Sequence, residues 1–183
     1  RGSGLAPRQQ QRERVMANIE TLPEFRLERM FAATRDEVWA AWTQPVSLEK
    51  WFGPKGCAAK SIKFDLKPGG MALTRLTIPG APPMYARFVF REIVAPKRLV
   101  WLHAVADEAG NAVKHPMAQE LPAQMLVVME LTDQGETTKL TLTKTPFEAS
   151  ASEVEAFRGM IPSMTGGWTG NFDVLDEFLA GKR

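Results

Sequence analysis

The stretch TGGWTGNFDVLDEFLAGKR, residues 165–183, decides the fold because it predicts an amphipathic helix at the end of the chain. Its apolar residues recur at i, i+4, i+7 and i+11 and therefore share one helical face: Trp168, Phe172, Leu175 and Leu179. Thr165 is placed to cap the start of this helix, and Gly181, followed by two basic residues, to end it. The apolar stripe, about 17 Å long at about 1.5 Å per residue, needs a surface on which to pack.

Alternation of apolar and polar residues between Phe25 and Thr145 predicts that surface, an antiparallel sheet. The alternation assigns these side chains to the inner face: Phe25, Leu27, Phe31, Ile62, Phe64, Leu66, Ala72, Thr74, Leu76, Ile78, Phe88, Phe90, Met125, Val127, Met129, Leu131, Leu140 and Leu142. Glu92 shares the face of Phe88 and Phe90. Both faces of residues 98–105 are apolar, so periodicity alone leaves the orientation of Trp101 and His103 open.

Two short helices are expected after the first strand. Thr34 caps the first, which Pro45 ends, and the second covers residues 47–52. A further short helix follows Ser152, and Pro162 is expected to separate it from the final helix. The predicted order is therefore strand, helix, helix, six strands, helix. Residues 107–122 are expected to form a long loop, either a lid or a cover for a sheet edge.

Composition narrows the class of protein. The 183 residues are 44% hydrophobic with a net charge of +2, which fits one domain over residues 21–183 and disfavours nucleic acid and membrane as partners. The single cysteine, Cys57, and the lack of a signal-type segment favour a reduced, cytoplasmic setting. Residues 1–20 are interpreted as an N-terminal extension or a cloning remnant, with a short helix over residues 9–19 if ordered. A basic RNA-binding arm is the alternative reading.

Several separated motifs occur in the order seen in one known family. They are VWAAWTQPVSLEKWFGPKG at 38–56, FDLKPGG at 64–70, FREIVAPKRLVW at 90–101, HPM at 115–117, TKLTLTKTPFEAS at 138–150 and MTGGWTGNFDVLDEFLA at 164–180. Over about residues 24–180 the chain resembles the activator of heat-shock protein 90 ATPase homologue family of the START-like SRPBCC superfamily. The resemblance implies an α+β helix-grip fold, like the birch-pollen allergen. In this fold a curved antiparallel sheet of about seven strands and two short helices enclose the C-terminal helix and leave an apolar cavity.

Phe52 departs from the family pattern, since many relatives have a second tryptophan there, and this affects the expected mouth of the pocket. By analogy with the family, Trp101 and His103 point inward. The residues predicted to line the ligand cavity are Trp51, Phe52, Phe64, Thr74, Phe88, Phe90, Trp101, His103, Met125, Val127, Met129, Phe147, Met160, Met164, Trp168 and Phe172. For each of them the alternative is a plain core position.

Polar residues give weaker signals for chemistry. His103 with Glu92 is a candidate acid–base pair, against a hydrogen-bonded core histidine. Lys144 shares the inner face and either reaches the anionic group of a ligand or extends to solvent. Gly166 and Gly167 favour close packing over anion binding. The two histidines and one cysteine have no metal-ligand spacing, and no cofactor motif is present, so neither a metal nor a cofactor is expected.

The favoured function is non-catalytic binding of a small apolar or amphipathic molecule between sheet and helix. The second hypothesis, implied by the resemblance, is modulation of a chaperone ATPase. The third is lyase- or cyclase-like chemistry in the same pocket. No family-wide catalytic set maps onto this sequence, and a homodimer is left open.

Overall fold

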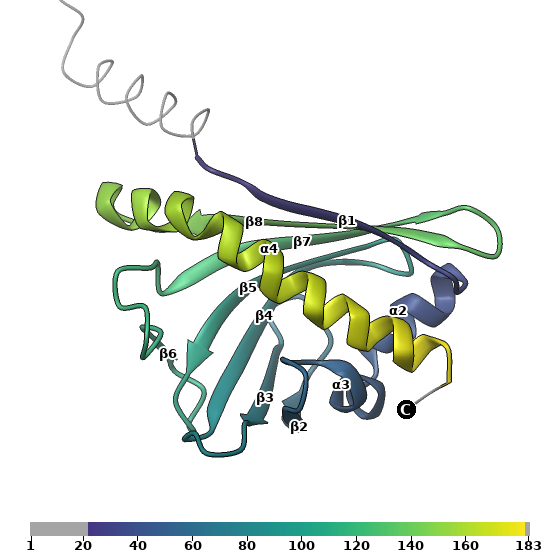
Figure 1. Ribbon diagram of the computed structural model, residues 1–183, viewed down its shortest axis with the longest axis horizontal. Helices are drawn as coiled ribbons and strands as arrows, with labels where there is room; N and C mark the ends of the chain where they lie inside the picture. Colours follow the sequence, from purple (N-terminus) through teal and green to yellow (C-terminus); the bar gives the residue numbers. More distant parts are fainter. Residues whose placement is uncertain (1–21, 182–183) are drawn as a thin grey trace, which may run out of the picture.

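The computed structural model describes residues 22–181, in which a curved antiparallel sheet wraps a long C-terminal helix (Figure 1). The elements follow in the order β1 (Phe25–Phe31), α2 (Arg35–Thr43), α3 (Pro45–Trp51), β2 (Ala58–Phe64), β3 (Met71–Thr77), β4 (Met84–Val94), β5 (Arg98–Ala106), β6 (Ala112–Val113), β7 (Gln124–Asp133), β8 (Thr138–Phe147) and α4 (Ala151–Leu179). The predicted α+β helix-grip fold is confirmed. The predictions for residues 1–20 and for the basic residues that follow Gly181 concern residues outside the described range.

The strands form one sheet in the order β1-β8-β7-β5-β4-β3-β2, with β6 paired to β5. Two rows of cross-strand partners run over its inner face. One contains Phe88, His103, Met125 and Pro146, and the other contains Phe90, Trp101, Val127 and Lys144. The predicted inward orientation of Trp101 and His103 is thereby confirmed.

The alternation fails at two β-bulges. The register of β2 against β3 shifts between Ser61 and Lys63, and Ile62 is 53% exposed, so its predicted inward position is wrong. The register of β4 against β5 shifts between Phe90 and Glu92. An extra residue in one strand reverses the face on which the following residues lie. Glu92 is accordingly exposed and forms an ion pair with Arg98 at 3.3 Å, which corrects its predicted inward position.

Helices α2 and α3 cover one end of the sheet. Thr34 caps α2 through a capping box with Glu37, as predicted. Helix α3 begins at Pro45, two residues before the predicted start, because proline suits the first turn of a helix, where no intrahelical bond to its nitrogen is needed. The Trp51 indole nitrogen donates to the Ala41 carbonyl oxygen at 2.9 Å and joins the two helices.

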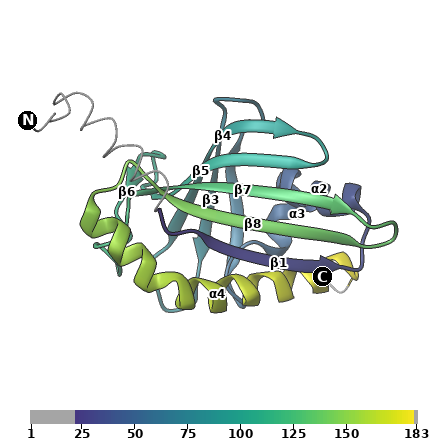
Figure 2. The same ribbon diagram turned by 90° about the horizontal axis from the view of Figure 1, so that it is seen from above.

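Helix α4 is one helix of 29 residues, so the predicted break at Pro162 is wrong. Its N-cap is Ser150, whose hydroxyl accepts from the Glu153 amide, rather than Ser152 or Thr165. Pro162 is exposed, so the carbonyl that it leaves without a helical donor faces the solvent side. Figure 2 shows the helix bending in its N-terminal third, the usual consequence of an internal proline.

Two anchors hold α4 on the sheet. Phe157 is fully buried near the N-terminal end, and Phe172, Val174 and Leu175 are buried near the C-terminal end. The Phe172 ring lies edge-on to Phe31 of β1, with 5.6 Å between ring centroids. Between the anchors, residues 158–171 include no buried side chain. The middle of α4 therefore packs on the core through partly buried side chains, such as Met164 and Trp168, and not through fully buried ones.

The prediction of a long loop over residues 107–122 is only partly right. This segment contains strand β6 and a bridge between His115 and Ala118. Ala118 and Leu121 are buried against the core. Within residues 22–181, no helix has the length and apolar character needed to cross a membrane.

Replacing Phe172 by alanine should destabilise the protein by about 3–5 kcal/mol, because it empties the C-terminal anchor of α4. Urea unfolding followed by circular dichroism measures this loss. Val46→Ala, at a side chain that is 71% exposed, is the control and should change stability by less than about 0.5 kcal/mol. A loss below about 1 kcal/mol for Phe172→Ala would contradict the anchor.

Candidate functional site

A cavity of about 320 Å³ lies between the middle of α4 and the inner face of the sheet. Its lining residues are Phe52, Gly53, Pro54, Leu76, Met84, Tyr85, Ala86, His103, Val105, His115, Lys144, Met164, Gly167, Trp168 and Asn171. Sheet, helix and the 107–122 segment all contribute. The volume is within the range of small-molecule sites, about 300–1,000 Å³.

Lys144 is the charged residue of this lining. Its side chain on β8 is buried, with 6% exposed, and its Nζ lies 5.3 Å from the centroid of the Trp168 ring. Among residues 22–181 it has no hydrogen-bonding or ion-pairing partner. Burial therefore lowers its pKa to about 8, since the ammonium has lost water and gained no anion. The alternative that this lysine extends to solvent is wrong.

His103 lies on the same face as Lys144, in the neighbouring row of cross-strand partners. Its ring packs edge-on to Phe88, with 5.5 Å between centroids. Burial, and after it the positive charge of Lys144, lower the pKa of His103 to about 3. The imidazole is therefore neutral at physiological pH, with one N–H donor and one acceptor nitrogen.

The charged residue and the apolar residues of the lining come from different strands. Lys144 lies on β8, two strands from His103 on β5, whereas Leu76 lies on β3, Met84 and Tyr85 on β4, and Phe52 at the end of α3. The lining contains neither aspartate nor glutamate. An amphipathic molecule fits this arrangement with its polar end toward Lys144.

A second void of only about 10 Å³ lies deeper in the core, about the volume needed for one water. It is lined by Trp42, Leu48, Phe64, Ala72, Phe88, Phe90, Leu99 and Trp101. The indole nitrogens of Trp42 and Trp101 are buried and lack a hydrogen-bond partner among the described residues. Phe88 contacts both Trp101 beside this void and Phe52 beside the larger cavity.

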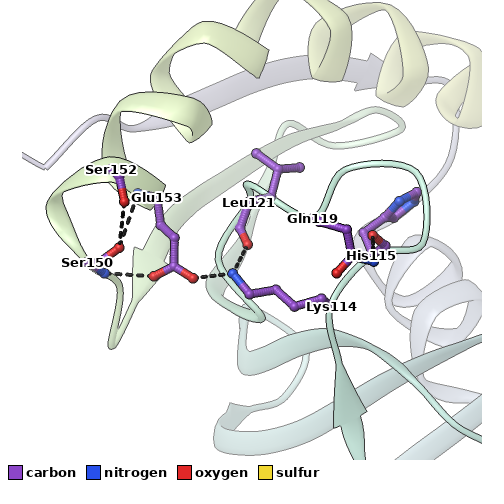
Figure 3. A network of polar contacts seen from close by, with 7 residues as sticks. All are labelled: Lys114, His115, Gln119, Leu121, Ser150, Ser152 and Glu153. Carbon is purple, nitrogen blue, oxygen red and sulfur yellow. Dashed lines mark hydrogen bonds and ion pairs between the residues drawn. The ribbon is translucent and has the colours of Figure 1, made fainter.

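A polar network fastens the 107–122 segment to the start of α4 (Figure 3). The Lys114 ammonium donates to the Leu121 carbonyl oxygen at 2.6 Å and forms an ion pair with Glu153. Glu153 also accepts from the Ser150 amide at 2.7 Å. Next to Lys114, the Nδ1 atom of His115 accepts from the Met117 amide at 3.1 Å, which orients the imidazole that lines the cavity. We call Lys114, Leu121, Ser150 and Glu153 the clasp.

The residues predicted to line the ligand cavity divide into three groups. Four line the larger cavity: Phe52, His103, Met164 and Trp168. Four line the small inner void: Phe64, Phe88, Phe90 and Trp101. The others line neither: Trp51, Thr74, Val127, Met129 and Phe172 are buried in the core, Met125 and Met160 pack against it, and Phe147 lies apart, 5.8 Å from the Arg91 guanidinium.

The structure does not support the predicted catalytic role of His103, because the acidic residue predicted to pair with it lies elsewhere. Glu92 is paired with Arg98 at the surface, so the proposed His103–Glu92 acid–base pair does not form. Cys57 is partly buried, and burial raises the pKa of its thiol, as suits an unreactive side chain.

Sequence reasoning missed much of the lining that lacks large side chains. Part of the lining consists of small residues that leave space for a ligand: Gly53, Pro54, Ala86 and Gly167. The hydrophobic pattern of the sequence identifies large buried side chains and therefore does not identify these positions. Strand alternation already placed Leu76 on the inner face, and it placed Lys144 there as well. The presence of a lysine at an inward position between Leu142 and Pro146 was the available signal for a polar end of the cavity.

The sheet curved around α4, with a cavity beneath the helix, defines a helix-grip protein. The family model for Activator of Hsp90 ATPase homolog 1-like proteins matches residues 32–180, so the chain belongs to this AHSA1 family. No functionally curated protein matches the sequence.

Solved structures show the same architecture. A protein from Arthrobacter aurescens, solved in solution by NMR, is 28% identical over 89% of this chain and 88% of its own, with a TM-score of 0.74. The crystal structure of protein Ms6760 from Mycobacterium smegmatis is 25% identical over 87% of this chain and 91% of its own, with a TM-score of 0.71. The AHSA1 protein from Silicibacter pomeroyi, at 17% identity and a TM-score of 0.66, supports the fold alone.

The clasp predicts a measurable acid sensitivity. The Lys114 ammonium, with the Ser150 amide and hydroxyl, lowers the pKa of Glu153 from 4.5 to about 2. A lowered carboxyl pKa stabilises the fold above its unfolded value, and this contribution is lost as the pH falls through the folded value. Glu153→Gln should therefore cost about 1 kcal/mol at pH 6, because the pair is partly exposed, and almost nothing at pH 2.

Urea unfolding of wild type and variant at several pH values measures that difference. Glu155→Gln, two residues further along α4 and in an exposed pair with Arg158, is the matched control. A stability difference for Glu153→Gln that is the same at every pH would show that the carboxylate charge does not stabilise the clasp.

Proposed function

We propose that this protein binds a small apolar or amphipathic molecule, without chemical conversion, in the cavity beneath α4. One observation carries the proposal: a helix anchored at both ends spans about 320 Å³ of mostly apolar space. The space is a partly open pocket and not an enclosed packing defect, so a solute can enter it from solvent. A pocket of this size, mostly apolar with a few polar groups in its lining, has the composition of a ligand site.

The expected affinity is moderate. A ligand that withdraws about 200 Å² of apolar surface from water gains about 5 kcal/mol at about 25 cal/mol per Å². Losses of translational and rotational freedom offset part of this gain. Shape alone therefore supports weak binding, and a polar contact is needed to reach micromolar affinity, about 8 kcal/mol.

Binding is favoured over catalysis because no carboxylate among residues 22–181 lines the cavity to form an acid–base pair with Lys144, whose pKa is lowered to about 8. General acid–base catalysis needs groups that exchange a proton near the working pH. His103 is neutral with a pKa of about 3, and its proposed partner Glu92 lies outside the cavity. The description of the family names activation of the Hsp90 ATPase, and that role rests on the family description alone.

Filling the cavity from α4 should abolish binding. Gly167 lines the cavity, and a Cβ added there meets nothing within 4 Å. Gly167→Leu should weaken binding of the neutral fluorescent probe N-phenyl-1-naphthylamine at least tenfold, because the new side chain occupies the space under the helix. Probe fluorescence titration measures this change.

Gly166→Leu is the matched control. Gly166 lies on the same helix, also has open space around it, and does not line the cavity. Both substitutions should raise stability by up to about 1 kcal/mol, since leucine favours a helix more than glycine does. Equal probe binding by the two variants, or no probe binding by the wild type, would refute the proposed site.

A further inference from the structure

We propose that the ligand of this cavity is a monocarboxylate with an apolar tail, whose carboxylate is bound by the Lys144 ammonium and whose tail lies toward Phe52, Leu76 and Met84. The inference rests on the proposed function and adds the chemical class of the ligand. It is drawn from the position of one buried cation and the absence of acids from the lining of the cavity.

Lys144 has a buried charge that nothing in the described chain neutralises. Lysine is almost never fully buried unless it is paired. Here the side chain is 6% exposed, and its cross-strand partners are Phe25 on β1 and Val127 on β7, both of which are buried and apolar. The ammonium therefore has three donors and no acceptor on these neighbours.

The contact with Trp168 does not compensate for this burial. A cation–π contact contributes about 0.5–2 kcal/mol, whereas removing an ion from water costs several kcal/mol even after relaxation. The distance of 5.3 Å between Nζ and the ring centroid is consistent with such a contact. The remaining cost is removed when an anion enters the cavity and pairs with the ammonium.

The charge of the site selects a monoanion. Lys144 is buried and is the residue of the lining that carries a charge at neutral pH. His103 beside it is neutral. A carboxylate brings one negative charge and neutralises the lysine. A phosphate monoester would bring close to two charges and leave one uncompensated in an apolar space.

The shape of the cavity orients the tail. Lys144 lies on β8, and Leu76 and Met84 lie on β3 and β4, on the other side of β7 and β5. Neighbouring strands are about 4.8 Å apart, so the tail crosses the strands of the sheet beneath α4. Phe52 and Pro54 close the apolar end.

The pH dependence follows from the same residue. Affinity for a carboxylate should be full below the pKa of Lys144, about 8, and fall as the pH rises above it, because the neutral amine no longer attracts an anion. The other titratable groups of the lining are His103 on β5, Tyr85 on β4 and His115 after β6. Helix α4 contributes Met164, Gly167, Trp168 and Asn171, none of which titrates.

The test compares decanoate with 1-decanol, which has the same tail and no charge, as displacers of N-phenyl-1-naphthylamine. Wild type, Lys144→Met and the control Lys63→Met, at an exposed position of β2, are titrated at pH 7. Lys144→Met should weaken decanoate binding at least tenfold and leave decanol binding within about threefold. Lys63→Met should change neither.

Each outcome separates the inference from the proposed function. If decanol binds and decanoate does not, or if Lys144→Met leaves decanoate affinity unchanged, the carboxylate is refuted and the cavity site stands. If neither compound displaces the probe from the wild type, the tail-binding cavity is refuted as well.

If Lys144→Met fails to fold, the wild type alone provides the test. Its affinity for decanoate must fall at least fivefold from pH 7 to pH 9 while its affinity for decanol stays constant. An equal change in the two affinities overturns the inference.

Discussion

The anchoring of α4 at two separate points is the constraint on which the rest of the structure depends. Phe157 fixes one end of the helix and Phe172, with Leu175, fixes the other, while Arg29 of β1 pairs with Asp173 and Asp176 and holds the C-terminal half in place. A straight, fully packed helix would fill the concave face of the sheet. Because Gly167 presents no side chain to this face between the anchors, the helix leaves space there instead. Met164 and Trp168 of α4 bound that space on the helix side.

The same arrangement explains why a lysine is stable at the inner face. Strand alternation places Lys144 in the row of Phe90, Trp101 and Val127, and the open space beneath α4 is what prevents its ammonium from being enclosed on every side. Burial, with a smaller contribution from the charge of Lys144, lowers the pKa of His103 and keeps it neutral. The cavity therefore presents one cation, neutral donors and an apolar end, and the clasp between Lys114 and Glu153 keeps the 107–122 segment beside it.

Much of this fold follows from local patterns in the sequence, and the exceptions have identifiable physical causes. Periodicity located the strands and the apolar stripe of the final helix, and residue type located the Thr34 cap, because each depends on neighbouring residues only. Bulges near Ile62 and Glu92 were not predictable, since the register is set by the opposite strand. Pro162 predicted a break, yet tertiary packing of Phe157 on one side and Phe172 on the other keeps the helix continuous. The large aromatic residues predicted to line the cavity mostly fill the core, because the residues that leave a cavity are small.

The most direct measurement of the central claim is the pKa of the Lys144 side chain in the unliganded protein. Lysine Cε resonances can be followed by two-dimensional NMR from pH 6 to pH 11, with the Lys144 signal assigned from the spectrum of Lys144→Met. The account predicts a midpoint near 8 for Lys144, while surface lysines titrate near their usual value of about 10.4. A midpoint for Lys144 that coincides with the surface lysines would mean that its ammonium is hydrated or paired, and would contradict a buried, unpaired cation beneath α4.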